Sequence, residues 1–275
     1  MEFATEFIQK VNGRLAELLS HAKVDACDFG IVNPLQEGYS YAVKDGGKRI
    51  RPMSVYLGAL STGIEVDEAK NDALVDLACM VELVHSYSLV HDDLPAMDND
   101  DYRRGKLSTH KKYGEANGIL IGDGLLTLAM VVGLNLNHGE DFVRGAEYIA
   151  KGAFNMVTGQ ALDLADGKKN YLDVYTLKTA ELISNSFAAG STLMGASDDM
   201  VRLAKEYGHH LGLAFQLADD LLDDGTEVSL VSEKGREYVV ALLNEETEKA
   251  INCAKTLSES ELLTAFATNL LKRTK

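Results

Sequence analysis

Apolar residues recur every three or four positions along most of the chain, which is the spacing of one face of an α-helix. The first such stretch, residues 3–21, places Phe7, Val11 and Leu15 on one face. Similar spacing predicts further helices over residues 51–60, 67–94, 115–136, 142–165, 171–194, 200–222 and 236–271. Asp67 and Asp198 stand where N-cap residues are expected.

Signals for β-strands are nearly absent, because there is no long alternating β-branched run and no Asn-Gly hairpin. Two polar stretches, residues 95–114 and 223–235, interrupt the helical pattern and are expected to be loops. No repeat or shift in composition divides the chain. The pattern therefore predicts an all-α protein, a single-domain bundle over residues 1–275 with about ten or more helices.

The charge balance excludes some partners. The chain of 275 residues carries 27 Lys and Arg against 42 Asp and Glu, a net charge of −15. Such acidity argues against nucleic-acid binding and against docking on anionic lipid, both of which need a basic face. A site for a phosphorylated substrate would need local charge reversal by clustered cations or by metal ions.

The cysteines predict a cytoplasmic protein. Cys27, Cys79 and Cys253 are scattered and form neither a disulfide framework nor a C-x-x-C metal site, which fits a reducing compartment. The first 20 residues lack the features of a signal peptide. The longest uncharged apolar stretch, residues 124–137, is too short to span a bilayer, so no stable membrane insertion is expected.

Five aspartates fall within ten residues in the segment HDDLPAMDNDDYRRG, and two arginines follow them. Asp92 and Asp93 end an apolar helix, Pro95 stops that helix, and Asp98 can fold back toward them. Clustered carboxylates repel one another unless a cation neutralises them, and their hard oxygens suit Mg²⁺. The alternative is an acidic loop that faces only solvent.

A second acidic cluster, FQLADDLLDD, also follows an apolar helix. Asp219 and Asp223 are one helical turn apart and share a face, and Gln216 precedes Asp220 by one turn. A single cluster of this kind is a weak signal. Two clusters, each at a helix C-terminus that disfavours anions, favour a metal-binding role.

Two further segments carry candidate residues. In GGKRIRP, which begins at Gly46, glycines permit close backbone approach and cations could hold a phosphate, although the spacing is not that of a P-loop. Lys178-Thr179 lies in an apolar helical stretch downstream of GQALDL. The alternatives are a basic helix start for the first and a surface lysine for the second.

In this order, the four segments resemble the trans-polyprenyl diphosphate synthase (isoprenyl diphosphate synthase) family, most closely its bacterial farnesyl diphosphate synthases. The resemblance covers roughly residues 38–224. It implies a bundle of helices around a deep central cavity, usually a homodimer. It further implies a prenyltransferase that condenses isopentenyl diphosphate with dimethylallyl or geranyl diphosphate to give farnesyl diphosphate.

The resemblance also implies a role for each matching residue. About three Mg²⁺ ions per site would hold the allylic diphosphate; their ligands match Asp92, Asp93, Asp98, Asp219 and Asp223. Arg103 matches an arginine that binds the allylic diphosphate. The isopentenyl diphosphate pocket matches Lys48, Arg51, His85 and Arg104. Groups that face the allylic diphosphate and the developing cation match Lys178, Thr179 and Gln216.

These residues suit ionisation of the allylic C–O bond, attack by the isopentenyl double bond, and proton loss. No protein nucleophile or general base is assigned. With the metal ligands Asp92, Asp93, Asp98 and Asp219, the residues Lys178, Thr179 and Gln216 make up the predicted catalytic set.

Product length is predicted from helix geometry. Ser88 and Tyr87 precede Asp92 by four and five positions, which places them roughly 6–7.5 Å deeper along the helix. A bulky Tyr87 would block growth of the prenyl chain. The spacing DDx₄D also resembles the fifteen-carbon pattern. The alternative for Tyr87 is simple core packing.

The chain departs from the family pattern after Asp224, where the loop is shorter by about ten residues. Lys234 is the only lysine in this stretch, so it is predicted to bind substrate in place of at most one of the two loop lysines that the resemblance implies. A shorter loop would change how the site closes over the diphosphate and excludes water. Alternatives are therefore a geranyl or geranylgeranyl diphosphate synthase, or a weakly active regulatory subunit of a heteromeric synthase. A class I terpene cyclase is disfavoured, because GGKRIRP and the arginine pair imply a second diphosphate substrate.

Overall fold

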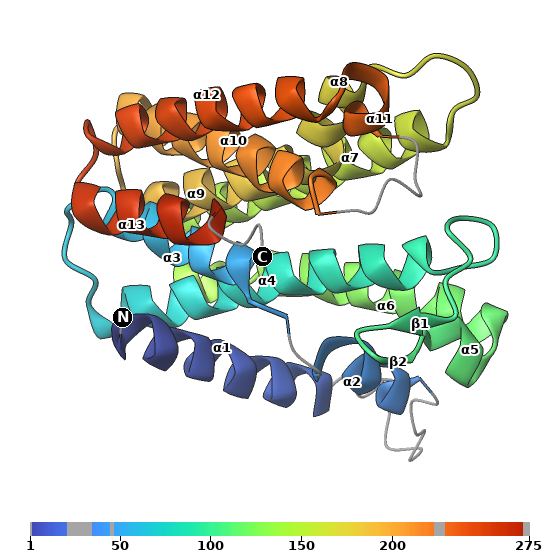
Figure 1. Ribbon diagram of the computed structural model, residues 1–275. Coiled ribbons are helices and arrows are strands. Elements are labelled where there is room, and N and C mark those ends of the chain that lie inside the picture. The colour runs from blue at the N-terminus through green and yellow to red at the C-terminus, as the bar shows by residue number, and fades with distance from the viewer. Residues whose placement is uncertain (1, 21–34, 45–46, 223–228, 272–275) are drawn as a thin grey trace, which may run out of the picture. The chain divides into compact units, whose positions relative to one another are not determined.

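The computed structural model describes residues 2–20, 35–44, 47–222 and 229–271 (Figure 1). These residues fold almost wholly as helices, so the predicted all-α class is confirmed. The first elements are α1 (Glu2–Ser20), α2 (Gln36–Lys44), α3 (Ile50–Leu60), α4 (Glu68–Asp92), α5 (Thr109–Tyr113), α6 (Glu115–Gly133) and α7 (Glu140–Leu164). Later elements are α8 (Tyr171–Tyr175), α9 (Glu181–Leu193), α10 (Asp198–Asp220), α11 (Leu230–Lys234), α12 (Arg236–Ala254) and α13 (Ser260–Leu271).

The chain packs as two compact units. The first comprises Met1–Met53 and Val75–Asn135, and the second comprises Ser54–Leu74 and Leu136–Lys275. Helices α3 and α4 contribute residues to both units.

Most predicted helices are found within two or three residues of their expected bounds. Asp67 caps α4 as expected, because its Oδ1 accepts a hydrogen bond from the Lys70 amide at 2.8 Å. The cap of α10 is Ser197 rather than Asp198, with its side chain accepting from the Met200 amide. Serine and aspartate both suit the cap position, so spacing alone could not separate these neighbours.

Two predicted helices are interrupted. The stretch 236–271 is divided into α12 and α13, and Glu259 between them has a left-handed φ of 54°. The stretch 171–194 contains a π-helical segment, Thr176–Ala180, between α8 and α9. Such segments occur within otherwise regular helices and are frequent at functional sites. Apolar spacing continues through both breaks, so it did not reveal them.

A short hairpin follows the first acidic cluster, where a loop was expected. Strand β1 (Tyr102–Arg103) pairs antiparallel with β2 (Lys106–Leu107). The two turn residues, Arg104 and Gly105, have φ values of 53° and 78°. Positive φ at both positions is typical of a type I′ turn. The usual sequence signal for this turn is Asn-Gly, whereas the turn residues here are Arg-Gly. The hairpin sets Arg103 at the end of β1 and Arg104 at the first position of the turn.

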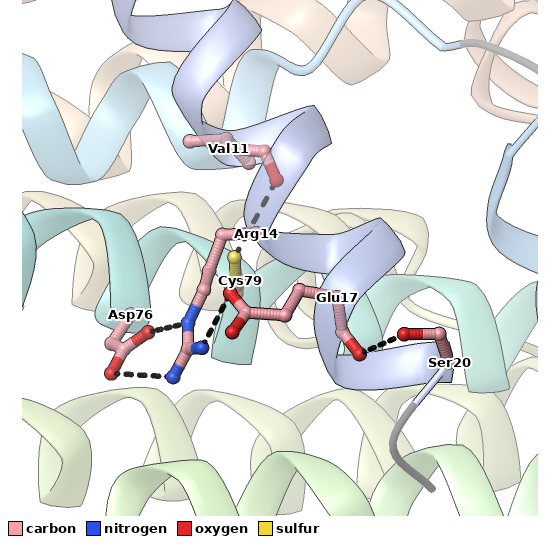
Figure 2. A network of polar contacts seen from close by, with 6 residues as sticks. All are labelled: Val11, Arg14, Glu17, Ser20, Asp76 and Cys79. Atoms are coloured by element: carbon pink, nitrogen blue, oxygen red, sulfur yellow. Dashed lines mark hydrogen bonds and ion pairs between the residues drawn. The ribbon is translucent and has the colours of Figure 1, made fainter.

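Polar contacts join α1 to α4 inside the first unit (Figure 2). Arg14 Nε donates to Asp76 Oδ1 at 2.7 Å, and Arg14 Nη1 donates to Glu17 at 2.8 Å. The buried Cys79 thiol donates to the Val11 carbonyl at 3.7 Å. These contacts fix the orientation of α1 against the helix that ends in the first aspartate cluster.

One cation of the GGKRIRP segment is part of the core of this unit. Arg49 is buried and forms an ion pair with the buried Glu82 of α4. It also donates to Asn12 Oδ1 and to the Val43 carbonyl, both at 3.0 Å. A buried charge needs such a complete set of partners. Arg49 therefore anchors the start of α3 beside α4.

Glycines allow close helix crossings in the second unit. A β-carbon at Gly58 of α3 would lie 2.2 Å from the Phe187 carbonyl oxygen, and one at Gly190 of α9 would lie 1.9 Å from the Val55 carbonyl oxygen. Similarly, Gly159 of α7 and Gly212 of α10 leave room for the backbone of the π-helical segment. That segment is thus held by close contacts on two sides.

Two helices are long and apolar enough to cross a membrane, judged by length and hydropathy alone: Glu68–Asp92 and Glu115–His138. The uncharged run 124–137 is only part of the second of these helices. The first helix has 83% of its apolar stretch buried, as in a core helix, whereas the second has 33% buried. The second helix therefore exposes a large apolar surface in the described chain.

Candidate functional site

The C-terminal end of α4 holds the first aspartate cluster. Asp92 and Asp93 are the last helical residue and the next, and the chain then reverses so that the Asp98 amide donates to the Asp92 carbonyl at 2.9 Å. Asn99, with a left-handed φ of 54°, donates its amide to the Leu94 carbonyl. The loop therefore returns Asp98 to the helix end, as the sequence predicted.

Arg103 of the hairpin is bound to this cluster. Its Nε donates to Asp93 Oδ1 at 2.9 Å, Nη2 contacts the same oxygen, and Nη2 is 3.2 Å from Asp100 Oδ2. Asp93 is only 2% exposed, and burial raises its pKa above the ordinary value, against the opposing effect of Arg103. Beside these side chains lies a cavity of about 30 Å³.

More cations gather in the same unit. Arg51 Nη1 is 3.2 Å from His85 Nε2, and since a guanidinium only donates, the histidine proton is on Nδ1. Burial, followed by the charge of Arg51, lowers the pKa of His85 well below its usual value, so the ring is neutral. A β-carbon at Gly47 would lie 2.9 Å from Arg104 Nη2, so glycine permits that close approach. Lys48, the residue after Gly47, is exposed.

Tyr87 and Ser88 lie one to two turns before the aspartates of α4. Tyr87 is 5% exposed, and its ring packs edge-on against His91 with centroids 5.8 Å apart. Its hydroxyl is buried with no hydrogen-bond partner among the described residues, and burial raises its pKa to about 12. The half-buried Ser88 donates to the His85 carbonyl at 3.0 Å.

The π-helical segment of the second unit presents Lys178 and Thr179. Lys178 Nζ donates to Asp163 Oδ2 at 2.7 Å, across to α7. Thr179 Oγ1 donates to Gln216 Oε1 at 2.7 Å, across to α10. The structure therefore brings Thr179 and Gln216 together, as expected for groups of one site.

The second aspartate cluster ends α10. Asp219 is half-buried, whereas Asp220 is buried and accepts from the Tyr175 hydroxyl at 2.9 Å and from the Val231 amide at 3.3 Å. The Tyr175 hydroxyl in turn accepts from the Leu230 amide at 3.1 Å. Burial and Asp220 raise the pKa of Tyr175 above its ordinary value. Asp220 thus joins α10 to α8 and α11.

For two predicted site residues, the described structure gives no contact that supports the predicted role. Asp223 lies outside the described residues. Lys234 is exposed at the end of α11 and forms an ion pair with Glu233 at 3.1 Å. Helix α11 itself was expected to be loop, and it begins with a capping box formed by Ser229 and Ser232. The predicted site residues are divided between the two units. The first unit holds Asp92, Asp93, Asp98 and the cationic residues, and the second holds Lys178, Thr179, Gln216, Asp219 and Lys234.

Three residues without a predicted role lie in or next to the segments that carry predicted ones. Asp163 is the partner of Lys178, and Asp220 is the partner of Tyr175. Gln160, three residues before Asp163, has amide atoms that are buried with no partner among the described residues. A lysine in an apolar helix needs a carboxylate, so the upstream GQALDL segment was the available signal for Asp163.

Comparisons with known proteins point to one family. Residues 32–230 match the polyprenyl synthetase family. The chain is 40% identical over 206 residues to a farnesyl diphosphate synthase of Geobacillus stearothermophilus, covering 70% of this chain and 67% of that protein. It is 35% identical over 266 residues to a farnesyl diphosphate synthase of Micrococcus luteus, covering 88% and 90%.

The fold is similar to that of a solved geranyltransferase from Legionella pneumophila, with a TM-score of 0.83, 30% identity, and coverage of 99% of this chain and 97% of that one. The two aspartate clusters at helix ends, the arginine hairpin and the Thr179–Gln216 pair all fall within the matched region. The chain therefore belongs to the polyprenyl synthetase family of prenyltransferases.

Proposed function

We propose that this chain is a farnesyl diphosphate synthase, which condenses isopentenyl diphosphate with dimethylallyl and then geranyl diphosphate. The observation that carries the proposal is the position of a carboxylate cluster beside a cationic cluster at one end of α4: Asp92 and Asp98 with Arg103. A diphosphate substrate that binds together with metal ions needs carboxylates to hold the metal ions and cationic side chains to hold its own oxygens. Its similarity to two farnesyl diphosphate synthases supports the product assignment.

The donor set fits Mg²⁺. Asp92 and Asp98 are brought together at the helix end by the 2.9 Å backbone bond, and carboxylate oxygens are hard ligands. Asp93 Oδ1 is occupied by Arg103, which leaves Oδ2 as its oxygen for a metal ion. Asp219 and Asp223 are the proposed ligands from the second unit. We infer about three ions per site, which when bound would stabilise the leaving diphosphate as Lewis acids.

The cations of the first unit would bind the two diphosphates. Arg103, oriented by Asp93, would hold the allylic diphosphate, because a planar guanidinium binds phosphate oxygens in pairs. Lys48, Arg51 and Arg104 would hold isopentenyl diphosphate. His85 stays neutral and accepts from Arg51, so its role is to fix the direction of that guanidinium.

The second unit would stabilise the developing carbocation. Thr179 donates a hydrogen bond to Gln216 Oε1, so the lone pairs of its hydroxyl are available to face positive charge. Lys178 is paired with Asp163 and would exchange that carboxylate for a diphosphate oxygen when substrate binds. The released diphosphate takes the proton, so no side chain is assigned as general base. We infer that the two units act as one functional domain.

The decisive experiment is incubation of the purified chain with Mg²⁺, isopentenyl diphosphate and each allylic diphosphate in turn. Farnesyl diphosphate is expected from dimethylallyl and from geranyl diphosphate, identified by mass spectrometry after dephosphorylation. Geranylgeranyl diphosphate as the main product would favour the longer-chain alternative. No condensation with any primer would contradict the proposal and would favour a regulatory subunit.

Asp92→Asn and Asp219→Asn should each lower kcat/KM at least about 100-fold, because each removes a ligand of metal ions that stabilise the leaving group. If both act on the same diphosphate, the double variant should lose much less than the product of the two single losses. Steady-state kinetics of the wild type, the two single variants and the double variant gives these losses of kcat/KM. Asp199→Asn, at an exposed position of α10, is the matched control. Fully multiplicative losses would mean that the two aspartates serve independent sites.

Tyr87→Ala should lengthen the product. The side chain is bulky and buried one to two turns below Asp92, where a growing prenyl tail would meet it. Its removal should move the main product from fifteen to about twenty carbons or more, read by chromatography of the dephosphorylated prenols. Ser88→Ala, at the neighbouring position, should change the length less. Unchanged length in Tyr87→Ala would mean that this tyrosine only packs in the core.

We infer a homodimer from the apolar side chains exposed on α6 and α7. Val131 of α6 is exposed in the first unit, and Phe154 and Val157 of α7 are exposed in the second, Phe154 by 73%. Large apolar side chains gathered on an exposed helix face often mark an interface. A second copy is favoured over a bilayer because the chain is strongly acidic, with a net charge of −15.

We also propose a cytoplasmic location, from the cysteine pattern.

Phe154→Glu should weaken the dimer about 30-fold or more, since a buried interface aromatic contributes about 2 kcal/mol. Sedimentation velocity should show a dimer for the wild type and a monomer for this variant at micromolar concentration. Tyr238→Glu, which charges an exposed aromatic on α12, is the control and should stay dimeric. A monomeric wild type that binds vesicles would contradict the proposal.

A further inference from the structure

Three potential metal ligands meet where the middle of α10 faces the C-terminal end of α12, away from the helix ends that carry the aspartates. Glu206 and His210 are one turn apart on α10, so they share a face, and Cys253 faces them from α12. The two helices pack side by side in the second unit (Figure 1). None of the roles proposed above uses these three side chains.

The donor atoms are already close together. One ligand atom from each of Glu206, His210 and Cys253 lies within 4.8 Å of the other two. In a tetrahedral zinc site, with bonds of about 2.0–2.3 Å, ligand atoms are about 3.5 Å apart. Side-chain rotations that move the donors together by about 1 Å would therefore complete the geometry without any shift of the helices.

A fourth residue orients the histidine. His210 Nδ1 is 2.6 Å from Oε2 of the buried Glu246, one residue of α12 that also pairs with Lys249. A carboxylate accepts from an imidazole N–H, so this contact places a proton on Nδ1 and leaves Nε2 as the nitrogen for a metal ion. A carboxylate behind a ligating histidine is the usual outer arrangement of zinc sites, and it raises the basicity of the ligand nitrogen.

The chemistry of the three ligands selects a class of metal. Thiolate and imidazole favour borderline-soft ions such as Zn²⁺ and Co²⁺, whereas Mg²⁺ prefers oxygen alone. Without metal, burial and then the charge of Glu206 raise the pKa of Cys253, so the thiol keeps its proton. Metal binding would convert thiol to thiolate and release that proton to solvent.

We propose that Glu206, His210 and Cys253 form a binding site for one Zn²⁺ ion, with Glu246 as the positioning residue of His210. Three protein ligands leave the fourth position for water. The ion links the middle of α10 to α12. Because α10 also carries Gln216 and Asp219 at its far end, bound Zn²⁺ steadies the helix that presents them.

Cobalt spectroscopy tests the site without reference to catalysis. Chelator-treated protein, free of Mg²⁺ and diphosphates, is titrated with Co²⁺. One equivalent should produce a thiolate-to-cobalt charge-transfer band in the near ultraviolet, and Zn²⁺ should abolish that band by competition. Aspartate clusters cannot give this band because they hold no sulfur. Absence of the band at one equivalent would overturn the proposal.

Variants separate the ligands from their surroundings. Cys253→Ser should abolish the band, and His210→Gln should weaken Co²⁺ affinity at least 100-fold. Glu246→Gln should weaken it about 10–100-fold and keep the band. His209→Gln, at the adjacent histidine, is the matched control and should change neither. A band that persists in Cys253→Ser would come from Cys27 or Cys79 and would overturn the assignment. Zn²⁺ should also raise the Tm of the wild type more than that of Cys253→Ser, whereas equal shifts would contradict the steadying of α10.

Discussion

Each candidate cluster depends on how a pair of adjacent aspartates is held at a helix C-terminus, where the backbone carbonyls disfavour negative charge. In both clusters the second aspartate is buried and bonded to the protein, while the first is half-buried at the helix end. Asp93 is bound by Arg103, and Asp220 accepts from Tyr175 and from the backbone of α11. Each buried carboxylate therefore fixes the helix end that presents its neighbour, Asp92 or Asp219.

The same bonds hold other candidate residues in place within each unit. Through Arg103, Asp93 fixes the type I′ hairpin that also carries Arg104. Through Tyr175 and the Val231 amide, Asp220 connects α10 to α8 and α11, and α8 leads directly into the π-helical segment with Lys178 and Thr179. An acidic chain thus concentrates part of its charge where arginines, tyrosine hydroxyls and metal ions can compensate it.

Sequence reasoning worked best where one residue type has one physical use. Apolar spacing located the long helices, and Pro95 with the aspartates located the end of α4 and the return of Asp98. It failed where the decisive feature is a backbone dihedral or a close contact. The Arg104-Gly105 turn, the reversal at Glu259 and the π-helical segment leave the apolar spacing unchanged. Asp163 and Asp220 had no assigned role because their partners are 15 and 45 residues away.

The sequence by itself determined the all-α class, the family, and which side chains are candidates for metal and diphosphate, because these follow from periodicity and from motif order. Only the tertiary structure decided which aspartate of each pair is buried and bonded to protein groups, that Arg49 belongs to the core, and that Cys253 faces Glu206 and His210. Those outcomes depend on packing between helices that are distant in the chain. Local spacing carries no information about such contacts, whereas burial and hydrogen bonding are decided by them.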